Sequence, residues 1–115
     1  MLDDVSISTL HAALNGLAAR QRAISDDIAN VNTPYFRART VAFEGDLKRA
    51  LGSGEDPLGV QPQTIVSTAA GGLTGNNVNL TDETVAAVNT QLAYELALRA
   101  TGDRFTLYRS AVRGA

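Results

Sequence analysis

The sequence predicts a mainly α-helical protein: an elongated pair of long N- and C-terminal helices, forming a coiled-coil-like hairpin, joined by a loop-rich middle with little or short β structure. Near the N-terminus apolar residues recur at steps of three and four, and a second such segment lies near the C-terminus. Glycine, proline and asparagine gather between them. We therefore divide the chain into a first helix (1–33), a middle segment (34–80) and a second helix (81–115).

The first helix is expected from about Val5 to Val31, with apolar residues at the a and d positions of heptads. Gln21 takes one of these positions, where a polar residue either fixes the register or is solvated at an edge of the seam. Gly16 costs up to about 1 kcal/mol relative to Ala, so it either admits a close neighbouring helix or is a tolerated defect. The predicted interface residues are Ile7, Leu10, Leu14, Leu17, Ile24, Ile28 and Val31.

The end of this helix is marked by residues 30–34, which read Asn30, Val31, Asn32, Thr33 and Pro34. A residue before proline disfavours helical geometry, and asparagine tolerates the left-handed conformation. We therefore expect an extended backbone at Thr33 and no helix through the two aromatic residues that follow Pro34.

The second helix is expected from about Thr81 to Val112, with Thr81 as N-cap and Asp82 and Glu83 in the first turn. Its apolar residues form two rows on different faces, so it needs neighbours on more than one side. The predicted interface residues on this helix are Val85, Val88, Leu92, Tyr94, Leu96, Leu98, Phe105 and Tyr108.

The predicted helix lengths imply an assembly. At 1.5 Å per residue the two helices are roughly 40 and 45 Å long, whereas a compact domain of this size has a radius of gyration of about 13 Å. A hairpin of two helices without a third layer leaves the second apolar face of the C-terminal helix in water. The core should therefore be completed by other copies or neighbours.

The middle segment is predicted to hold short elements only. Residues 36–40 and 64–68 are candidate strands, and Phe43, Leu47 and Leu51, with a Glu44–Lys48 pair, suggest a short helix that ends at residues 52–54. The segment is too short and polar for a core of its own, so we interpret it as an excursion between the helices.

Composition excludes several classes of function. The chain has 115 residues, 44% of them hydrophobic and 19% charged, as in a folded single domain. A net charge of −2 gives no reason to expect nucleic acid or an anionic membrane surface. Cysteine is absent, no apolar run approaches the roughly 20 residues of a membrane-spanning helix, and the acidic start lacks the pattern of a secretory signal.

The sequence offers no catalytic, cofactor-binding or metal-binding constellation. His11 lies on the outer side of the heptad row, where a solvated helix residue is the expected role. Asp26 and Asp27 are adjacent, so on a helix their side chains diverge. The glycine-rich stretch 71–75 lacks the lysine and hydroxyl of a phosphate-binding loop. Four arginines near the helix end are candidates for salt bridges with partners rather than for nucleic acid; they are Arg20, Arg22, Arg37 and Arg39. We expect no enzyme.

Both ends of the chain carry motifs of a known family. The chain resembles the flagellar axial proteins, in particular the proximal rod proteins of the basal body. The resemblance covers about two-thirds of the chain and departs at Tyr35, where the family commonly has glycine after Thr-Pro. The matching residues are Ile28-Ala29-Asn30, the helix-end motif of Asn30, Asn32, Thr33 and Pro34, then 36–39, 77–80, Gln91, Leu92, Tyr94, Phe105, Tyr108 and Arg109.

The resemblance implies a structural subunit that polymerises helically into the hollow drive shaft of the rod, transmitting torque and letting export substrates pass. It implies export without a cleaved signal peptide, and a place in the periplasmic part of the basal body. The implied partners are further copies, FlgC-like rod proteins, the FliE adaptor, and membrane-ring and export-gate proteins, with no nucleic acid and no direct membrane insertion.

Two alternatives stay open at this point. Another axial protein, either FlgC-like or from the distal rod or hook, would share the helix-end motif, although the small middle segment and the Phe105-Tyr108-Arg109 ending favour the proximal rod. A soluble helical adaptor or export chaperone would also show long amphipathic helices, but would form a stable helical oligomer alone.

Overall fold

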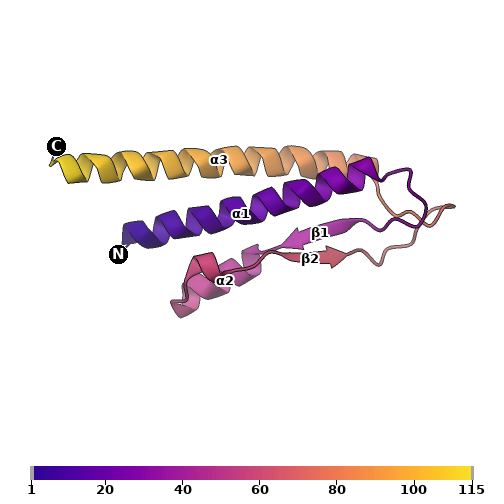
Figure 1. Cartoon of the computed structure of the whole chain (residues 1–115), viewed down its shortest axis with the longest axis horizontal. Coiled ribbons are helices and arrows are strands. Elements are labelled where there is room, and N and C mark those ends of the chain that lie inside the picture. Colours follow the sequence, from indigo (N-terminus) through magenta and orange to yellow (C-terminus); the bar gives the residue numbers. More distant parts are fainter. Residues whose placement is uncertain (1, 115) are drawn as a thin grey trace.

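The structure, a computed structural model, describes residues 2–114. Its elements in chain order are α1 (Leu2–Ala29), β1 (Arg39–Ala42), α2 (Glu44–Ser53), the 3-10 turn η1 (Pro57–Gly59), β2 (Gln63–Val66) and α3 (Leu80–Arg113). The long helices α1 and α3 run antiparallel, so both termini lie at one end and the connecting loops at the other (Figure 1). The molecule measures 64 × 27 × 14 Å, which confirms a mainly helical, elongated fold.

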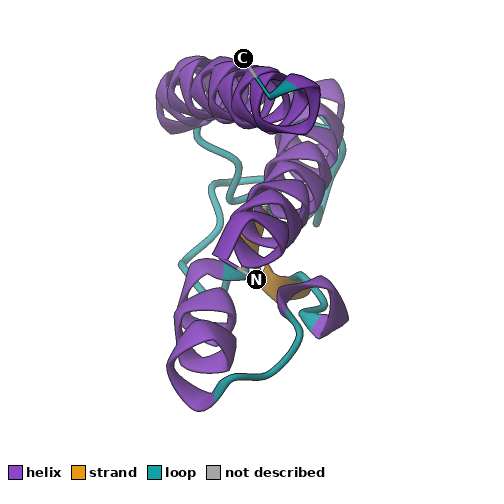
Figure 2. Ribbon diagram, turned by 90° about the vertical axis from the view of Figure 1, so that its left-hand side faces the viewer, coloured by secondary structure: helices purple, strands orange, loops and turns teal. Residues whose placement is uncertain are grey.

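Helix α1 is the middle layer of three. Seen end-on, α3 lies on one side of it, and α2 and the β-hairpin lie on the other (Figure 2). The buried cluster joins α1 to the middle segment and comprises Ala12, Leu17, Val41, Phe43 and Leu47. The interpretation of the middle as an excursion beside a two-layer hairpin is therefore wrong, because the middle segment supplies much of the core.

The two strands pair antiparallel, with Arg39 opposite Val66 and Ala42 opposite Gln63. Both predicted strands exist, with bounds moved by a few residues. Val41 is the one buried residue of β1, whereas all of β2 is exposed. The hairpin thus contacts α1 through β1, and β2 is its outer edge.

Helix α2 follows the predicted pattern but not the predicted ion pair. Leu47 and Ala50 are its buried residues, and the helix ends at Gly54, whose φ of 76° is left-handed. Glu44 does not pair with Lys48 along the helix. Its carboxylate instead accepts from the guanidinium of Arg20 on α1, at 2.6 and 2.8 Å, which joins α2 to the central helix.

Gly16 is the point of closest approach between α1 and the middle segment. A Cβ added there would lie 2.4 Å from two atoms of the Phe43 ring. The glycine therefore admits a close neighbour rather than being a tolerated defect, but the neighbour is an aromatic ring and not a helix. Arg20 covers the same ring, with its guanidinium carbon 5.0 Å from the centroid.

The helix ends are close to those predicted. Helix α1 ends at Ala29, and the following residues turn without continuing the helix through Tyr35 and Phe36. At the start of α3 the predicted N-cap is wrong. Asn79, not Thr81, caps the helix, because its side-chain oxygen accepts from the backbone N–H of Asp82 at 3.1 Å. The helix then runs unbroken to Arg113.

Candidate functional site

The seam between α1 and α3 is built from small residues of α3. Thr90 is buried, and Ala93 and Ala97 pack against the core cluster. The half-buried Ala86 precedes them at the same spacing of three and four. Small side chains let two helices approach closely, because interaxial distance follows side-chain size. Sequence reasoning missed this row, although a repeat of alanine and threonine at helical spacing was the signal for it.

The large apolar residues of α3 point away from this seam. Val85, Val88, Leu92 and Leu96, spaced by three and four, are 55%, 63%, 55% and 57% exposed. We call these four residues the outer row. A row of four half-exposed aliphatic residues exceeds the scattered exposure normal for a monomer and indicates a contact surface.

The remaining predicted interface residues divide by helix. On α1, Leu17 and Ile24 are buried, and the others are half-buried. On α3, Tyr94 is half-buried and faces α1, whereas Leu98 is exposed. The half-buried residues on α1, with the loop residue Val31, are Ile7, Leu10, Leu14, Ile28 and Val31.

The C-terminal part of α3 has no apolar contact surface within the subunit. Phe105 and Tyr108 are 50% and 53% exposed, and Leu107 and Val112 are exposed further. This part of α3 extends past the start of α1 (Figure 1). Its aromatic and aliphatic side chains are therefore exposed to solvent.

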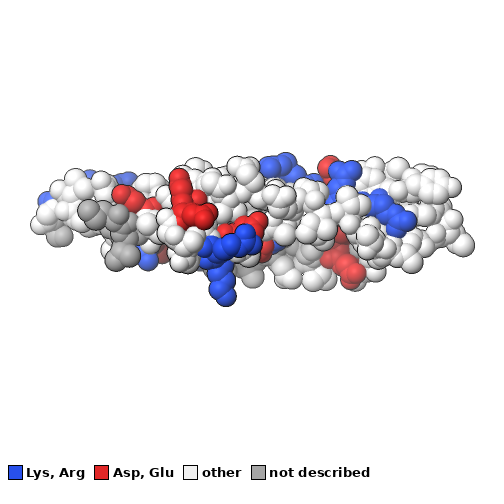
Figure 3. Space-filling view, turned by 90° about the horizontal axis from the view of Figure 1, so that it is seen from below, with Lys and Arg blue, Asp and Glu red and all other residues white. Residues whose placement is uncertain are grey.

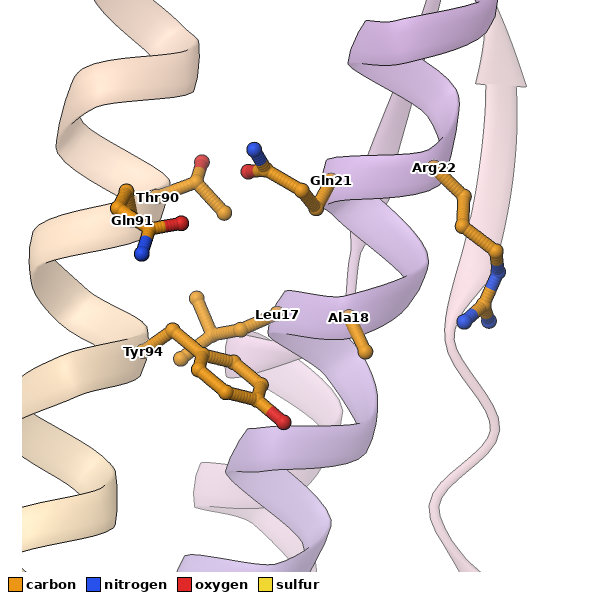
Figure 4. Close-up of a pocket in the computed structure, with 7 residues that line it drawn as sticks. All are labelled: Leu17, Ala18, Gln21, Arg22, Thr90, Gln91 and Tyr94. Carbon is orange, nitrogen blue, oxygen red and sulfur yellow. The ribbon is translucent and has the colours of Figure 1, made fainter.

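A groove of about 250 Å³ opens between α1 and α3. A second groove shares Gln21 and Gln91 with it and is lined by Val88 and Leu92 of the outer row. Leu17 and Gln21 extend from α1 toward Thr90, Gln91 and Tyr94, whereas Arg22 points away from α3 (Figure 4). The Oε1 atom of Gln21 is buried and accepts no hydrogen bond from the described residues. The carbonyl of Gln21 thus faces α3 and is not a solvated side chain at the edge of the seam.

The loop end of the molecule is held together by asparagine side chains. The Nδ2 atom of Asn76 donates to the carbonyl oxygens of Asn30 and Thr33, both at 2.8 Å. The side chain of Asn77 accepts from the backbone N–H of Ala38 at 2.6 Å. The predicted helix-end motif is therefore one half of a two-loop structure, whose other half comes from residues just before α3.

Tyr35 sits at this end with a φ of 62°, in the left-handed region that favours glycine. Its backbone N–H donates to the carbonyl of Thr74 at 2.9 Å, which fixes the conformation. The departure from the family pattern thus leaves the turn in a glycine-like geometry, with an aromatic side chain added to it.

Asp27 lies where α1, β1 and α3 meet, and its side chain is fully buried. Its two carboxylate oxygens accept from the backbone N–H of Arg39, at 3.2 and 3.1 Å. Burial, and then the neighbouring carboxyl of Asp27, raise the pKa of Glu83 in the first turn of α3 to about 7. When Glu83 is protonated, its carboxyl is placed to donate a hydrogen bond to Asp27, which would link α3 to α1.

Charge on the surface is mixed. In a view onto the side of α2 and the hairpin, acidic and basic side chains lie among one another (Figure 3). Arg20 is engaged with Glu44, and Arg37 donates to the carbonyl of Ala69 at 2.6 Å. The arginines near the helix end are therefore tied into the fold to different degrees and form no continuous basic patch on this face.

Within residues 2–114, no three His, Cys, Asp or Glu side chains come together in a way that could hold a metal ion. None of the helices in this range is both long and apolar enough to cross a membrane. The exposed apolar surfaces of the subunit are the outer row, the groove beside it and the C-terminal end of α3.

Comparisons with known proteins give the family. No family model matches the chain. The flagellar basal body rod protein FlgB of Escherichia coli is 30% identical over 122 residues, covering 87% of this chain and 88% of that protein. FlgB of Salmonella typhimurium is 26% identical over 136 residues, covering 99% of each. A stretch of 48 residues is 44% identical to FlgB of Borrelia hermsii, covering 42% of this chain and 36% of that protein.

The similarity to the Escherichia coli protein covers 87% of this chain, so it includes the middle segment and at least part of each long helix. The chain belongs to the FlgB family of flagellar basal body rod proteins.

Proposed function

We propose that this FlgB-family rod protein builds the rod by packing the outer row of α3 against helices of neighbouring subunits, in a coiled-coil-like arrangement. The observation that carries the proposal is the division of α3 into two faces. Small residues close the seam with α1, and Val85, Val88, Leu92 and Leu96 stay exposed at helical spacing. A helix that served only its own subunit would place its largest apolar residues inward.

Burial of the outer row would stabilise an assembly. Each aliphatic side chain contributes about 1.5–3 kcal/mol when fully buried, and roughly half of each is still exposed. The row thus offers on the order of 1 kcal/mol per residue, repeated in every copy. This is enough to hold subunits together cooperatively, but not to make a tight isolated dimer.

The finer roles come from the resemblance to the rod proteins and not from this surface. We propose that the subunit is exported without a cleaved signal, has no enzymatic activity, and contacts FlgC-like rod proteins, the FliE adaptor and the ring and export-gate proteins. The three-part division into residues 1–33, 34–80 and 81–115 then separates two assembly helices from a middle segment that braces α1. The rod so formed would carry torque and leave a channel for export substrates.

The test is a charge placed in the outer row. Leu92→Asp puts a carboxylate at a position that is 55% exposed in the subunit, so the isolated fold should keep its helix content and urea midpoint. In cells, each intersubunit contact would then bury an unpaired charge at a cost of several kcal/mol, and rods should be absent and cells non-motile.

The matched control is Asn15→Asp, which adds the same charge at an exposed polar position of α1, away from the outer row. Its rods and motility should be normal. Normal basal bodies in cells carrying Leu92→Asp would show that the outer row is not an assembly surface.

A further inference from the structure

Helix α3 is joined to the rest of the subunit by few buried contacts. All members of the buried cluster belong to α1 and the middle segment, and none belongs to α3. Between Leu80 and Arg113, Thr90 is the one buried residue, while Ala93, Tyr94 and Ala97 are partly buried. Because the buried cluster does not depend on α3, the helix can leave α1 without dismantling the core.

The loop before α3 provides a pivot for such a movement. Asn76 donates to two backbone carbonyls just after α1, both at 2.8 Å, and Asn77 accepts from the backbone N–H of Ala38 at 2.6 Å. The cap of α3, in which Asn79 accepts from the backbone N–H of Asp82, lies within the helix itself. The chain is therefore anchored up to Asn77, and the helix begins two residues later, so the residues between them serve as a hinge.

A pair of carboxyl groups joins the first turn of α3 to α1. Asp27 of α1 is fully buried, and its two oxygens accept from one donor, the backbone N–H of Arg39 on β1, at 3.2 and 3.1 Å. Glu83 of α3 lies within hydrogen-bond reach of this carboxylate. Two carboxylates so close, one of them fully buried, repel each other when both are ionised, whereas one proton between them turns the repulsion into a hydrogen bond.

The other charged groups around this pair do not neutralise it. Arg20 and Arg39 line a hollow of about 180 Å³ beside Glu83, but Arg20 is bonded to Glu44, and the guanidinium of Arg39 lies over the ring of Phe36. Asp82, in the same turn of α3, adds a further negative charge. Within residues 2–114 neither carboxyl of the pair forms an ion pair, so a proton is what balances their charge.

We propose that Asp27 and Glu83 form a proton-operated latch, which holds α3 on α1 while they share one proton and favours release of α3 about the loop before Asn79 when the proton is lost. The core of α1 and the middle segment stays folded in the released state. The released helix frays, because a helix without tertiary contacts is marginal. The latch is a property of the single subunit and does not depend on the outer row.

The direction of the pH dependence follows from the docked state. Burial, and then the Asp27 carboxyl, raise the pKa of Glu83 from 4.5 to about 7 in the docked subunit, and release returns Glu83 to water. The latch is therefore fully closed below about pH 4.5 and weakens as the pH rises to about 7. A shift of this size changes the ratio of released to docked subunits by up to several hundredfold, and screening at the partly exposed Glu83 reduces this to about tenfold.

Thiol labelling of Thr90→Cys measures the release directly, because the natural chain has no cysteine and Thr90 is buried against α1. The reagent is dithionitrobenzoate, and each rate is divided by that of the urea-unfolded chain at the same pH, which removes the titration of the thiol. The corrected rate should rise about tenfold between pH 5 and pH 8. Glu83→Gln in the same chain should abolish the rise, whereas Glu95→Gln, at an exposed position of α3, should keep it.

Urea distinguishes release of α3 from unfolding of the whole subunit, because release exposes less surface. Labelling of Thr90→Cys should depend on urea less steeply than labelling of Ala50→Cys, which is buried on α2, across α1 from α3 (Figure 2). Ala93→Cys, one turn further along α3, gives a second reading if Thr90→Cys disturbs the fold by circular dichroism. Equal urea dependence at α3 and α2, or a rise with pH that Glu83→Gln leaves intact, would overturn the latch.

Discussion

Replacing Glu83 by Gln should make the protein more stable at pH 8 and leave its stability at pH 5 almost unchanged. Glu83 lies against the buried Asp27, and burial followed by the Asp27 carboxyl raises the pKa of Glu83 from 4.5 to about 7. The folded state thus binds a proton on Glu83 that the unfolded state has lost between pH 4.5 and pH 7. Stability therefore falls as pH rises through this window, and the loss is complete above pH 7.

The size of the effect follows from the shift. A rise in the pKa of Glu83 from 4.5 to about 7 corresponds to a loss of about 3 kcal/mol in the free energy of unfolding at full effect. Because Glu83 is only partly buried, screening by water reduces this loss to about 1–2 kcal/mol. Glutamine keeps the shape and donates an amide N–H to Asp27 without carrying charge. We assign the proton to Glu83, because Asp27 already accepts from Arg39 with both oxygens.

The assay is urea unfolding followed by circular dichroism at several values of pH between 5 and 8. The difference between Glu83→Gln and the natural chain should grow from near zero to about 1–2 kcal/mol across this range. Glu95→Gln is the matched control, since Glu95 is exposed on α3 and bonds only to Gln91 in its own helix. A difference that does not change with pH would refute the shared proton.

Two further substitutions test the packing of the middle segment on α1. Gly16→Ala forces a methyl group against the Phe43 ring, at 2.4 Å before relaxation, and should lower the free energy of unfolding by about 1–3 kcal/mol. Gly45→Ala is the control, because a Cβ added at Gly45 meets no atom within 4 Å, and it should raise the free energy of unfolding by up to about 1 kcal/mol. If Gly16→Ala were equally harmless, the Phe43 ring could not lie against Gly16. Arg20→Ala should lower the free energy of unfolding in urea by about 1.5–3 kcal/mol, because Arg20 donates hydrogen bonds to Glu44 and to the carbonyl of Val41. Arg22→Ala is the control, since Arg22 is exposed, and it should change the stability little. Equal losses for the two variants would show that the bonds of Arg20 contribute nothing to stability.

The two long helices could be predicted because their signal is local. Spacing of three and four, a proline after the helix end and acidic residues in the first turn all act within a few residues of the chain. The N-cap of α3 was predicted two positions too late, because the contacts that decide it are not local. Asn79 and Thr81 both suit an N-cap, and only the path of the preceding loop, fixed by Asn76 and Asn77, decides between them.

The assignment of faces could not be predicted. Large apolar residues on α3 suggested an inward row, yet alanines and Thr90 face α1 and the outer row faces solvent. Periodicity finds an apolar face but cannot say which molecule covers it. Arg20 was likewise interpreted as a residue for salt bridges with partners, whereas it bonds within its own chain. Its bonds to Glu44 and Val41 span more than twenty residues of sequence, and no local pattern reports such contacts.

The difference between the two long helices explains how one subunit can be folded and still require neighbours. Helix α1 is covered on both sides, by α3 and by the middle segment, so its apolar residues are largely satisfied within the chain. Helix α3 is covered on one side only, and every residue from Gly102 to Arg113 is exposed. A helical segment of this length is marginal without tertiary contacts, and its Phe105 and Tyr108 have none to make within the subunit. If the outer row packs against neighbouring subunits as proposed, assembly completes α3 rather than α1, and burial of the exposed apolar residues of α3 supplies the driving free energy.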